Sequence, residues 1–421
     1  MFTTEEKKMI ALSSLGGALE YYDFAIFAFL VKVLEQLFFP AVDPAAALMA
    51  TLAVFAVGYL ARPIGGILFG HFGDKAGRKK TFVVTVFLMA LPTFLIGCLP
   101  TYQSFGLAAA VLLIILRIFQ GLAVGGELPG AVVFIAETVN GNRGFATGLI
   151  LFGVNMGMLA GSFVGAWVAQ LPPDKLLSWG WRLPFWLGGV LGILSVYLRK
   201  RLHETPLFKV LKQNHASVKR PFLEVVTHFP KPLLQNIAIV ALQAIIISLF
   251  YLFMPTYLAT YYHYSLAALL KLNTISILIF VAPVLFLSWL SDKVGRKILT
   301  GIGITYFILG SYPVFLVFSF QHFNGVVLAL IISYLFNGFI AACFPCMSAE
   351  LFPTQVRYTG VALAYNIGFG IIGGLVPFIT NGLIHITHDR LAPSFVIIAA
   401  ALIAAIALFT VPETYQRSLK E

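Results

Sequence analysis

Long, uninterrupted apolar stretches are the feature that most constrains this chain. A helix needs about 20 mostly apolar residues to span a bilayer, and twelve such stretches follow one another with no polar domain between them. Only 11% of the residues are charged, too few for a water-soluble surface. The sequence therefore predicts an all-α membrane protein with twelve transmembrane helices, near residues 9–36, 46–70, 81–99, 106–136, 145–170, 182–199, 233–260, 266–290, 298–319, 325–350, 359–384 and 393–411.

The positive charges predict how the chain crosses the membrane. The formal net charge is +11, which on a soluble protein would suggest a nucleic-acid partner. Most of the 28 Lys and Arg lie in loops on one side of the predicted helices, Arg199 and Arg296 among them. Because cytoplasmic loops carry an excess of Lys and Arg, we expect both termini and these loops to be cytoplasmic. The charge is then explained by the lipid bilayer, and no nucleic-acid partner is expected.

The two halves of the chain carry the same polar landmarks in the same order. A turn with an aspartate and, four positions later, an arginine follows the second and the eighth stretch. A glutamate with an arginine after it closes the fourth and the tenth stretch. Many transporter folds are built from such internal repeats. The paired residues are Asp74 with Asp292, Arg78 with Arg296, Glu137 with Glu350, and Arg143 with Arg357.

This repeat predicts the domain organisation and a role for the paired charges. We expect a six-helix bundle at 1–199, a basic cytoplasmic connector at 200–232 and a second, pseudo-symmetric six-helix bundle at 233–421. Aspartate and glutamate can pair with arginine, while Arg and Lys stay at the cytosolic interface. We interpret the paired charges as a cytoplasmic gate that closes when the cavity opens outward. The alternative is that they only anchor the loops.

Ionisable side chains inside the predicted helices are concentrated in the first half: Glu20, Asp23, Arg62, Arg117 and Glu127. Such groups are costly within a membrane and by default mark a transport pathway. A requirement of the fold alone should recur in both halves, and this cluster does not. We therefore interpret it as functional, with a permanent buried salt bridge as the alternative.

Proton coupling needs a carboxylate whose affinity for a proton changes between transport states. Asp23 is the first candidate, with Arg117 as its competing cation. Glu127 with Arg62 is the second pair. Glu20 lies three residues before Asp23 and shares its helical face. The predicted proton-coupling residues are therefore Asp23, Arg117, Glu127 and Glu20.

The first half of the chain carries several short motifs: Glu20-Tyr-Tyr-Asp23-Phe24, Ala61-Arg62-Pro63-Ile-Gly65-Gly66, Arg117-Ile-Phe-Gln120-Gly121 with Gly125-Gly126-Glu127, and Trp181-Arg182-Leu-Pro184-Phe185. Together with the repeated turns, these motifs resemble those of the major facilitator superfamily, a fold of two six-helix bundles around a central cavity. The subtype is similar to the metabolite:proton symporters, which carry proline, betaine, 2-oxoglutarate, shikimate and related solutes, and to the intraphagosomal amino-acid transporters of bacterial pathogens. The resemblance implies alternating access and a location in the bacterial cytoplasmic (inner) membrane. It also supports the Asp23 and Arg117 pair, because a helix-one Asp and a helix-four Arg are proton-linked in related sugar symporters.

Two solute classes fit the candidate binding residues. An arginine suits a carboxylate, and aromatic faces suit an ammonium group by cation–π attraction. A zwitterion would use both, and a plain organic acid only the arginines. The predicted solute-binding residues are Arg62, Arg117, Phe24, Phe27, Gln120, Gln243, Tyr251, Tyr365 and Asn366.

The function expected from these features is proton-coupled symport of a small zwitterionic or carboxylate solute, such as an amino acid, betaine or organic acid. We expect no primary pump, since the sequence has no nucleotide-binding GxxxxGK[ST] motif. We expect no enzymatic activity, since no nucleophile is grouped with a base and no metal ligands are grouped. No metal and no cofactor beyond the proton gradient is expected, and we expect a monomer. The alternatives are a uniporter or exchanger of organic acids, or a non-coupled channel or sensor on the same fold.

Overall fold

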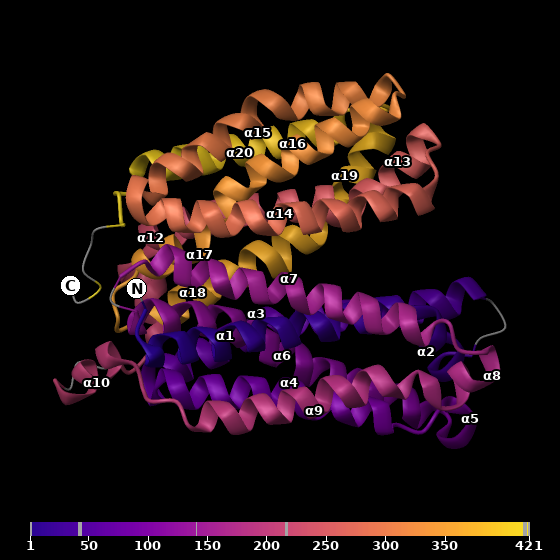
Figure 1. The fold of residues 1–421 in the computed structure, drawn as a ribbon, viewed down its shortest axis with the longest axis horizontal. Coiled ribbons are helices and arrows are strands. Elements are labelled where there is room, and N and C mark those ends of the chain that lie inside the picture. Colours follow the sequence, from indigo (N-terminus) through magenta and orange to yellow (C-terminus); the bar gives the residue numbers. More distant parts are fainter. Residues whose placement is uncertain (1, 41–43, 140, 215–217, 416–418, 420–421) are drawn as a thin grey trace. The chain divides into compact units, whose positions relative to one another are not determined.

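Helices form almost the whole structure (Figure 1). The computed structural model describes the chain except for residues 1, 41–43, 140, 215–217, 416–418 and 420–421, and it leaves out the side chains of some further helical residues. No strand occurs in the described part. Each of the twelve predicted stretches coincides there with one helix or with consecutive helices, and ten of these are long and apolar enough to cross a membrane. The other two stretches correspond to Thr4–Phe29 (α1) with Val31–Phe38 (α2) and to Pro44–Ala76 (α3).

The chain divides into two units, of which the first comprises Met1–Thr138 and Leu149–Phe222. The stretch predicted at 9–36 is not one helix, because α1 ends at Phe29 and a turn at Leu30 separates it from α2. The helices up to His228 are α1 (Thr4–Phe29), α2 (Val31–Phe38), α3 (Pro44–Ala76), α4 (Arg78–Cys98), α5 (Tyr102–Phe105), α6 (Leu107–Thr138), α7 (Arg143–Val168), α8 (Pro173–Lys175), η1 (Leu176–Gly180), α9 (Arg182–Lys200), α10 (Pro206–Gln213) and α11 (Pro221–His228).

The second unit comprises Val139–Gly148 and Leu223–Glu421, so it includes the first residues of α7. Two of its long helices contain π-helical segments, η2 and η3, near their middle. The remaining helices are α12 (Pro230–Ile246), η2 (Ile247–Phe253), α13 (Met254–Tyr262), α14 (Leu266–Val294), α15 (Arg296–Ser319), α16 (Phe323–Ala341), α17 (Phe344–Glu350), α18 (Arg357–Tyr365), η3 (Asn366–Gly373), α19 (Gly374–Thr387) and α20 (Ala392–Thr410).

Glycines let the helices of the first unit approach closely. In α7, glycines on a four-residue spacing, typical of a close-packing helix face, lie against α1: a Cβ at Gly157 would collide with the backbone of Ala18. On α6, Gly121 and Gly125 contact the backbone of α3 in the same way, at Gly58 and Arg62. The close packing of α3 on α6 brings polar side chains of both helices to one place.

Candidate functional site

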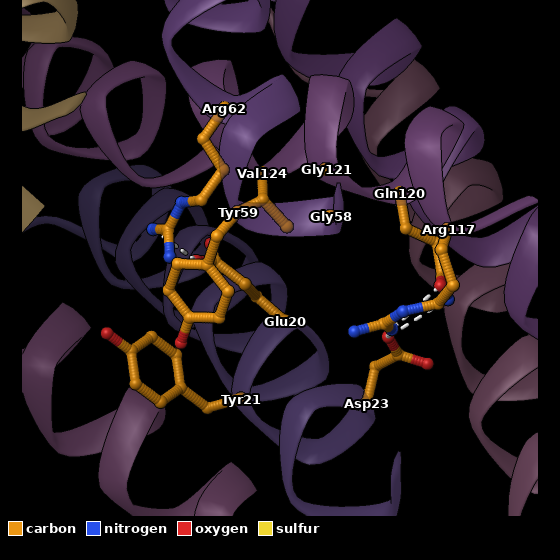
Figure 2. A pocket seen from close by; sticks show the side chains of 10 residues that line it. All are labelled: Glu20, Tyr21, Asp23, Gly58, Tyr59, Arg62, Arg117, Gln120, Gly121 and Val124. Carbon is orange, nitrogen blue, oxygen red and sulfur yellow. Dashed lines mark hydrogen bonds and ion pairs between the residues drawn. The ribbon is translucent and has the colours of Figure 1, made fainter. Parts of the chain in front are cut away.

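A pocket in the first unit collects most of the buried ionisable residues predicted from the sequence. Its volume is about 60 Å³, room for a few water molecules. Figure 2 shows the ion pair of Arg62 with Glu20 at one side of the pocket and that of Arg117 with Asp23 at the other. The side chains come from α1, α3 and α6, and the lining residues are Glu20, Tyr21, Asp23, Gly58, Tyr59, Arg62, Arg117, Gln120, Gly121 and Val124.

Asp23 is held by three donors. Its carboxylate accepts hydrogen bonds from Arg117 Nη1 at 3.2 Å, from Gln120 Nε2 at 2.9 Å and from Thr93 Oγ1 at 3.0 Å. The Arg117 guanidinium also lies over the ring of Phe27, with its Cζ 4.1 Å from the ring centroid. The structure thus brings together four predicted site residues, while Thr93, which α4 supplies, was not predicted.

Arg62 pairs with Glu20 and not with Glu127. The shortest distance, from Arg62 Nη2 to Glu20 Oε1, is 3.6 Å. Arg62 also lies near the ring of Tyr59, with its Cζ 5.2 Å from the centroid. Both charged side chains are buried, at 7% and 5% exposure, and both line the pocket.

Glu127 has Arg199 as its partner, which corrects the predicted pairing with Arg62. Arg199 Nη1 donates to Glu127 Oε1 at 2.7 Å, and Thr85 Oγ1 donates to the other carboxylate oxygen at 2.6 Å. Arg199 also donates to the carbonyl oxygens of Leu12 and Phe82. Glu127 and Arg199 are fully buried and connect α1, α4, α6 and α9. The reason is helix packing, since the end of α9 turns Arg199 into the bundle.

By sequence Arg199 is among the positive charges of the loops, but the structure buries it inside the first unit. It has 0% exposure, and its Cζ lies 3.6 Å from the centroid of the Phe82 ring. Its sequence neighbours Lys200 and Arg201 are exposed. Counting charges cannot tell which of Arg199, Lys200 and Arg201 is buried. Arg199 lies four residues after the buried Ser195 and therefore on the same helical face.

The second unit's predicted solute-binding residues lie at or near its π-helical segments. Gln243 is in α12, Tyr251 is in η2, and Tyr365 and Asn366 stand where α18 passes into η3. The two π-helical segments are joined by a hydrogen bond from Ser248 Oγ to the Gly373 carbonyl oxygen at 2.7 Å. π-Helical turns often occur at functional sites.

Tyr251 belongs to an aromatic group. Its ring centroid is 4.4 Å from that of Tyr334 and 5.8 Å from that of Phe280, and its hydroxyl accepts a 3.4 Å hydrogen bond from Asn337. Tyr365 packs instead on Phe369, with ring centroids 4.7 Å apart. The side chain of Phe24, also predicted to bind solute, lies outside the described residues.

The charges predicted to form the gate are buried and paired in the first unit. Arg78, with 0% exposure, contacts Asp74 at 3.1 Å and Glu137 at 3.2 Å. Thr205 Oγ1 donates to Glu137 at 2.7 Å. At the start of α4, where Gly77 has φ of +118°, the carboxylate of Glu204 accepts a hydrogen bond from the Lys79 backbone N–H. Such a φ favours glycine.

The second unit repeats this arrangement. Arg296 contacts Asp292 at 2.8 Å and Glu350 at 3.3 Å, and Thr414 Oγ1 donates to Glu350 at 2.6 Å. Glu413 accepts hydrogen bonds from the Arg296 and Lys297 backbone N–H groups, next to Gly295 with φ of +108°. The paired Glu-Thr motifs Glu204-Thr205 and Glu413-Thr414 were not among the predicted site residues, although their repetition is visible in the sequence.

Arg143 and Arg357, the last two predicted gate residues, also make contacts within the second unit, and Asp292 makes further ones. Asp292 accepts hydrogen bonds at 2.8 Å from the backbone N–H groups of Gly144 and Phe145, in the first turn of α7, and Arg143 lies 3.9 Å from Glu350. Carboxylates are stabilised at helix N-termini in this way. Arg357 donates to the carbonyl oxygens of Ala349 and Phe352.

A repeated helical fold with buried charges in its membrane-spanning part defines a multi-pass membrane transporter. The sequence pattern of the Major Facilitator Superfamily matches residues 13–377, and the chain belongs to this family. Its fold is accordingly two pseudo-symmetric six-helix bundles.

Curated relatives cover nearly the whole chain. The glycine betaine/proline/ectoine/pipecolic acid transporter OusA of Dickeya dadantii is 35% identical over 98% of this chain and 85% of its own length. The proline/betaine transporter of Escherichia coli K12 is 34% identical with the same coverage. A solved structure of the proton:xylose symporter XylE with 6-bromo-6-deoxy-D-glucose superposes with a TM-score of 0.83 at 18% identity, covering 99% of this chain and 98% of that one. At that identity the likeness concerns the fold alone.

Proposed function

We propose that this transporter is a proton-coupled symporter that imports a small zwitterionic or carboxylate solute by alternating access. The observation that carries the proposal is the buried Asp23 carboxylate, which shares a pocket wall with Arg117 and Gln120. The names of the relatives support the solute class, since they include proline, glycine betaine and ectoine.

In the proposed mechanism Asp23 carries the proton. While Arg117 is bound to it, the two charges compensate each other, which favours the charged form of the carboxylate. If a helix movement during transport draws Arg117 away, the buried carboxylate is left uncompensated, which is costly. Proton uptake removes that cost, and renewed pairing with Arg117 expels the proton. Glu127 is the second candidate, with Arg199 in place of Arg62 as its competing cation.

The remaining predicted residues have supporting roles in the proposal. Gln243, Tyr251, Tyr365 and Asn366 stay candidates for solute contacts. The charge clusters around Arg78 and Arg296 belong to the cytoplasmic gate and change partners as the transporter changes state. Burial supports this role over loop anchoring, because a charge that only anchors a loop gains nothing from leaving water.

The rest of the proposal concerns the protein's setting. The excess of Lys and Arg in one set of loops supports cytoplasmic termini in the bacterial cytoplasmic membrane. The same proposal includes six-helix bundles at 1–199 and 233–421 and a connector at 200–232. It also includes a monomeric state, no enzymatic activity and no cofactor beyond the proton gradient.

The experiment is uptake into proteoliposomes that contain the purified protein. With labelled proline or glycine betaine outside, we expect accumulation above equilibrium when the lumen is made alkaline, and its loss when a protonophore is added. Equilibration without accumulation would contradict symport and favour a uniporter or channel. Exchange against internal solute that ignores the proton gradient would favour an exchanger.

A further inference from the structure

The two ion pairs of the pocket differ in how fully their carboxylates are coordinated. Asp23 accepts three hydrogen bonds at 2.9–3.2 Å, whereas the shortest contact of Glu20 with Arg62 is 3.6 Å. Oε2 of Glu20 is buried and has no hydrogen-bond partner among the residues that the structure describes. A buried charged acceptor without donors is costly. Both carboxylate oxygens of Asp23 accept hydrogen bonds, whereas Oε2 of Glu20 is open to a further donor.

We propose that Glu20 and Arg62 bind the two charged ends of one zwitterionic solute and select zwitterions over singly charged solutes. The inference rests on the transport function proposed above and deepens it. The solute carboxylate accepts hydrogen bonds from the Arg62 guanidinium, and the cationic group contacts Glu20 Oε2. The rings of Tyr21 and Tyr59 line the same pocket (Figure 2), and aromatic faces attract ammonium groups.

Charge balance explains the selectivity. A zwitterion inserted between Glu20 and Arg62 replaces their 3.6 Å ion pair by one pair at each charged end of the solute, so that both buried charges stay compensated. A plain carboxylic acid anion would pair with Arg62 and leave Glu20 as an uncompensated anion, while a plain cation would leave Arg62 without its carboxylate. Removing one partner of a buried pair is strongly unfavourable. This arrangement also separates the two carboxylates, with Asp23 for the proton and Glu20 for the solute.

The first test uses the wild-type protein and solutes of equal shape. Glycine betaine is compared with 3,3-dimethylbutanoate, in which carbon replaces the ammonium nitrogen, and L-proline with tetrahydrofuran-2-carboxylate. Binding to purified protein is measured by isothermal titration calorimetry. We expect at least one zwitterion to bind about tenfold or more tightly than its anionic counterpart, since an unpaired buried charge costs at least that factor. Equal affinities would overturn the inference and leave symport of carboxylates intact.

The second test changes the charge of Glu20 alone. In Glu20→Gln the preference for the zwitterion over its anionic counterpart should fall about tenfold or more, with affinity for the anion unchanged or improved. Glu35→Gln is the control, because Glu35 lies on α2 and does not line the pocket. An undiminished preference in Glu20→Gln would refute the role of Glu20. If the wild type neither binds nor accumulates any of these solutes, the proposed function and the inference both fail.

Discussion

The buried pair of Glu127 and Arg199 makes a prediction about stability whose size follows from its surroundings. Arg199→Met removes a cation that hydrogen-bonds to Glu127 and to two backbone carbonyl oxygens, with no exposure to solvent. Methionine fills much of the same volume, so the main loss is the compensation of the Glu127 charge. Removing one partner of a buried ion pair costs about 3–5 kcal/mol. We expect the free energy of unfolding to fall by about that amount.

The assay is denaturant unfolding of the purified protein in detergent, with Arg201→Met as the matched control. Arg201 is exposed at the end of the same helix, and surface substitutions change stability by about 0.5 kcal/mol or less. The double variant Glu127→Gln with Arg199→Met no longer buries an uncompensated charge. It should be more stable than Arg199→Met alone, so the two single effects are not additive.

Two outcomes would refute the reasoning. If Arg199→Met unfolds at the same denaturant concentration as the Arg201→Met control, the buried pair contributes nothing to stability. If the losses of the two single variants simply add in the double variant, Glu127 and Arg199 are energetically independent in spite of the 2.7 Å contact between them.

Three other substitutions test the pocket, the gate and the helix packing. Asp23→Asn should abolish proton-driven accumulation in proteoliposomes and preserve solute exchange, because the side chain can no longer release a proton; full accumulation would contradict the role of Asp23. Asp74→Asn weakens one buried contact of Arg78, and a hydrogen bond to a charged group contributes about 1.5–3 kcal/mol. Turnover should therefore fall about tenfold or more, with solute affinity nearly unchanged. A loss of affinity at normal turnover would contradict the role of this residue in the gate. Gly157→Ala should lower the free energy of unfolding by about 1–3 kcal/mol, because the added methyl group overpacks against α1. Gly374→Ala is the control and should not lower it, because there is open space at the Cβ position. Equal effects would argue against close packing of α7 on α1.

Local properties explain why the helices and the pocket's charges could be predicted. The length of an apolar stretch and the cost of a charge within it depend on the residues themselves and on the bilayer. The repeat was equally visible, and it placed Arg78 and Arg296 at matching turns. A break such as the turn at Leu30 was not predictable from apolarity, because α2 continues the apolar stretch beyond it.

The partners of Glu20 and Glu127 are what only the tertiary structure decided. The sequence predicted the pair of Asp23 with Arg117, which the structure shows, but it paired Glu127 with Arg62 and offered no partner for Glu20. The pairings follow from how far each helix is rotated and how closely it approaches its neighbour, and these depend on contacts such as Gly121 against Gly58. Packing turns Arg199 toward Glu127 and leaves Arg62 to Glu20 at 3.6 Å. The sequence alone therefore determined that charges are buried in this membrane protein, and the packing of distant segments determined which charges compensate one another.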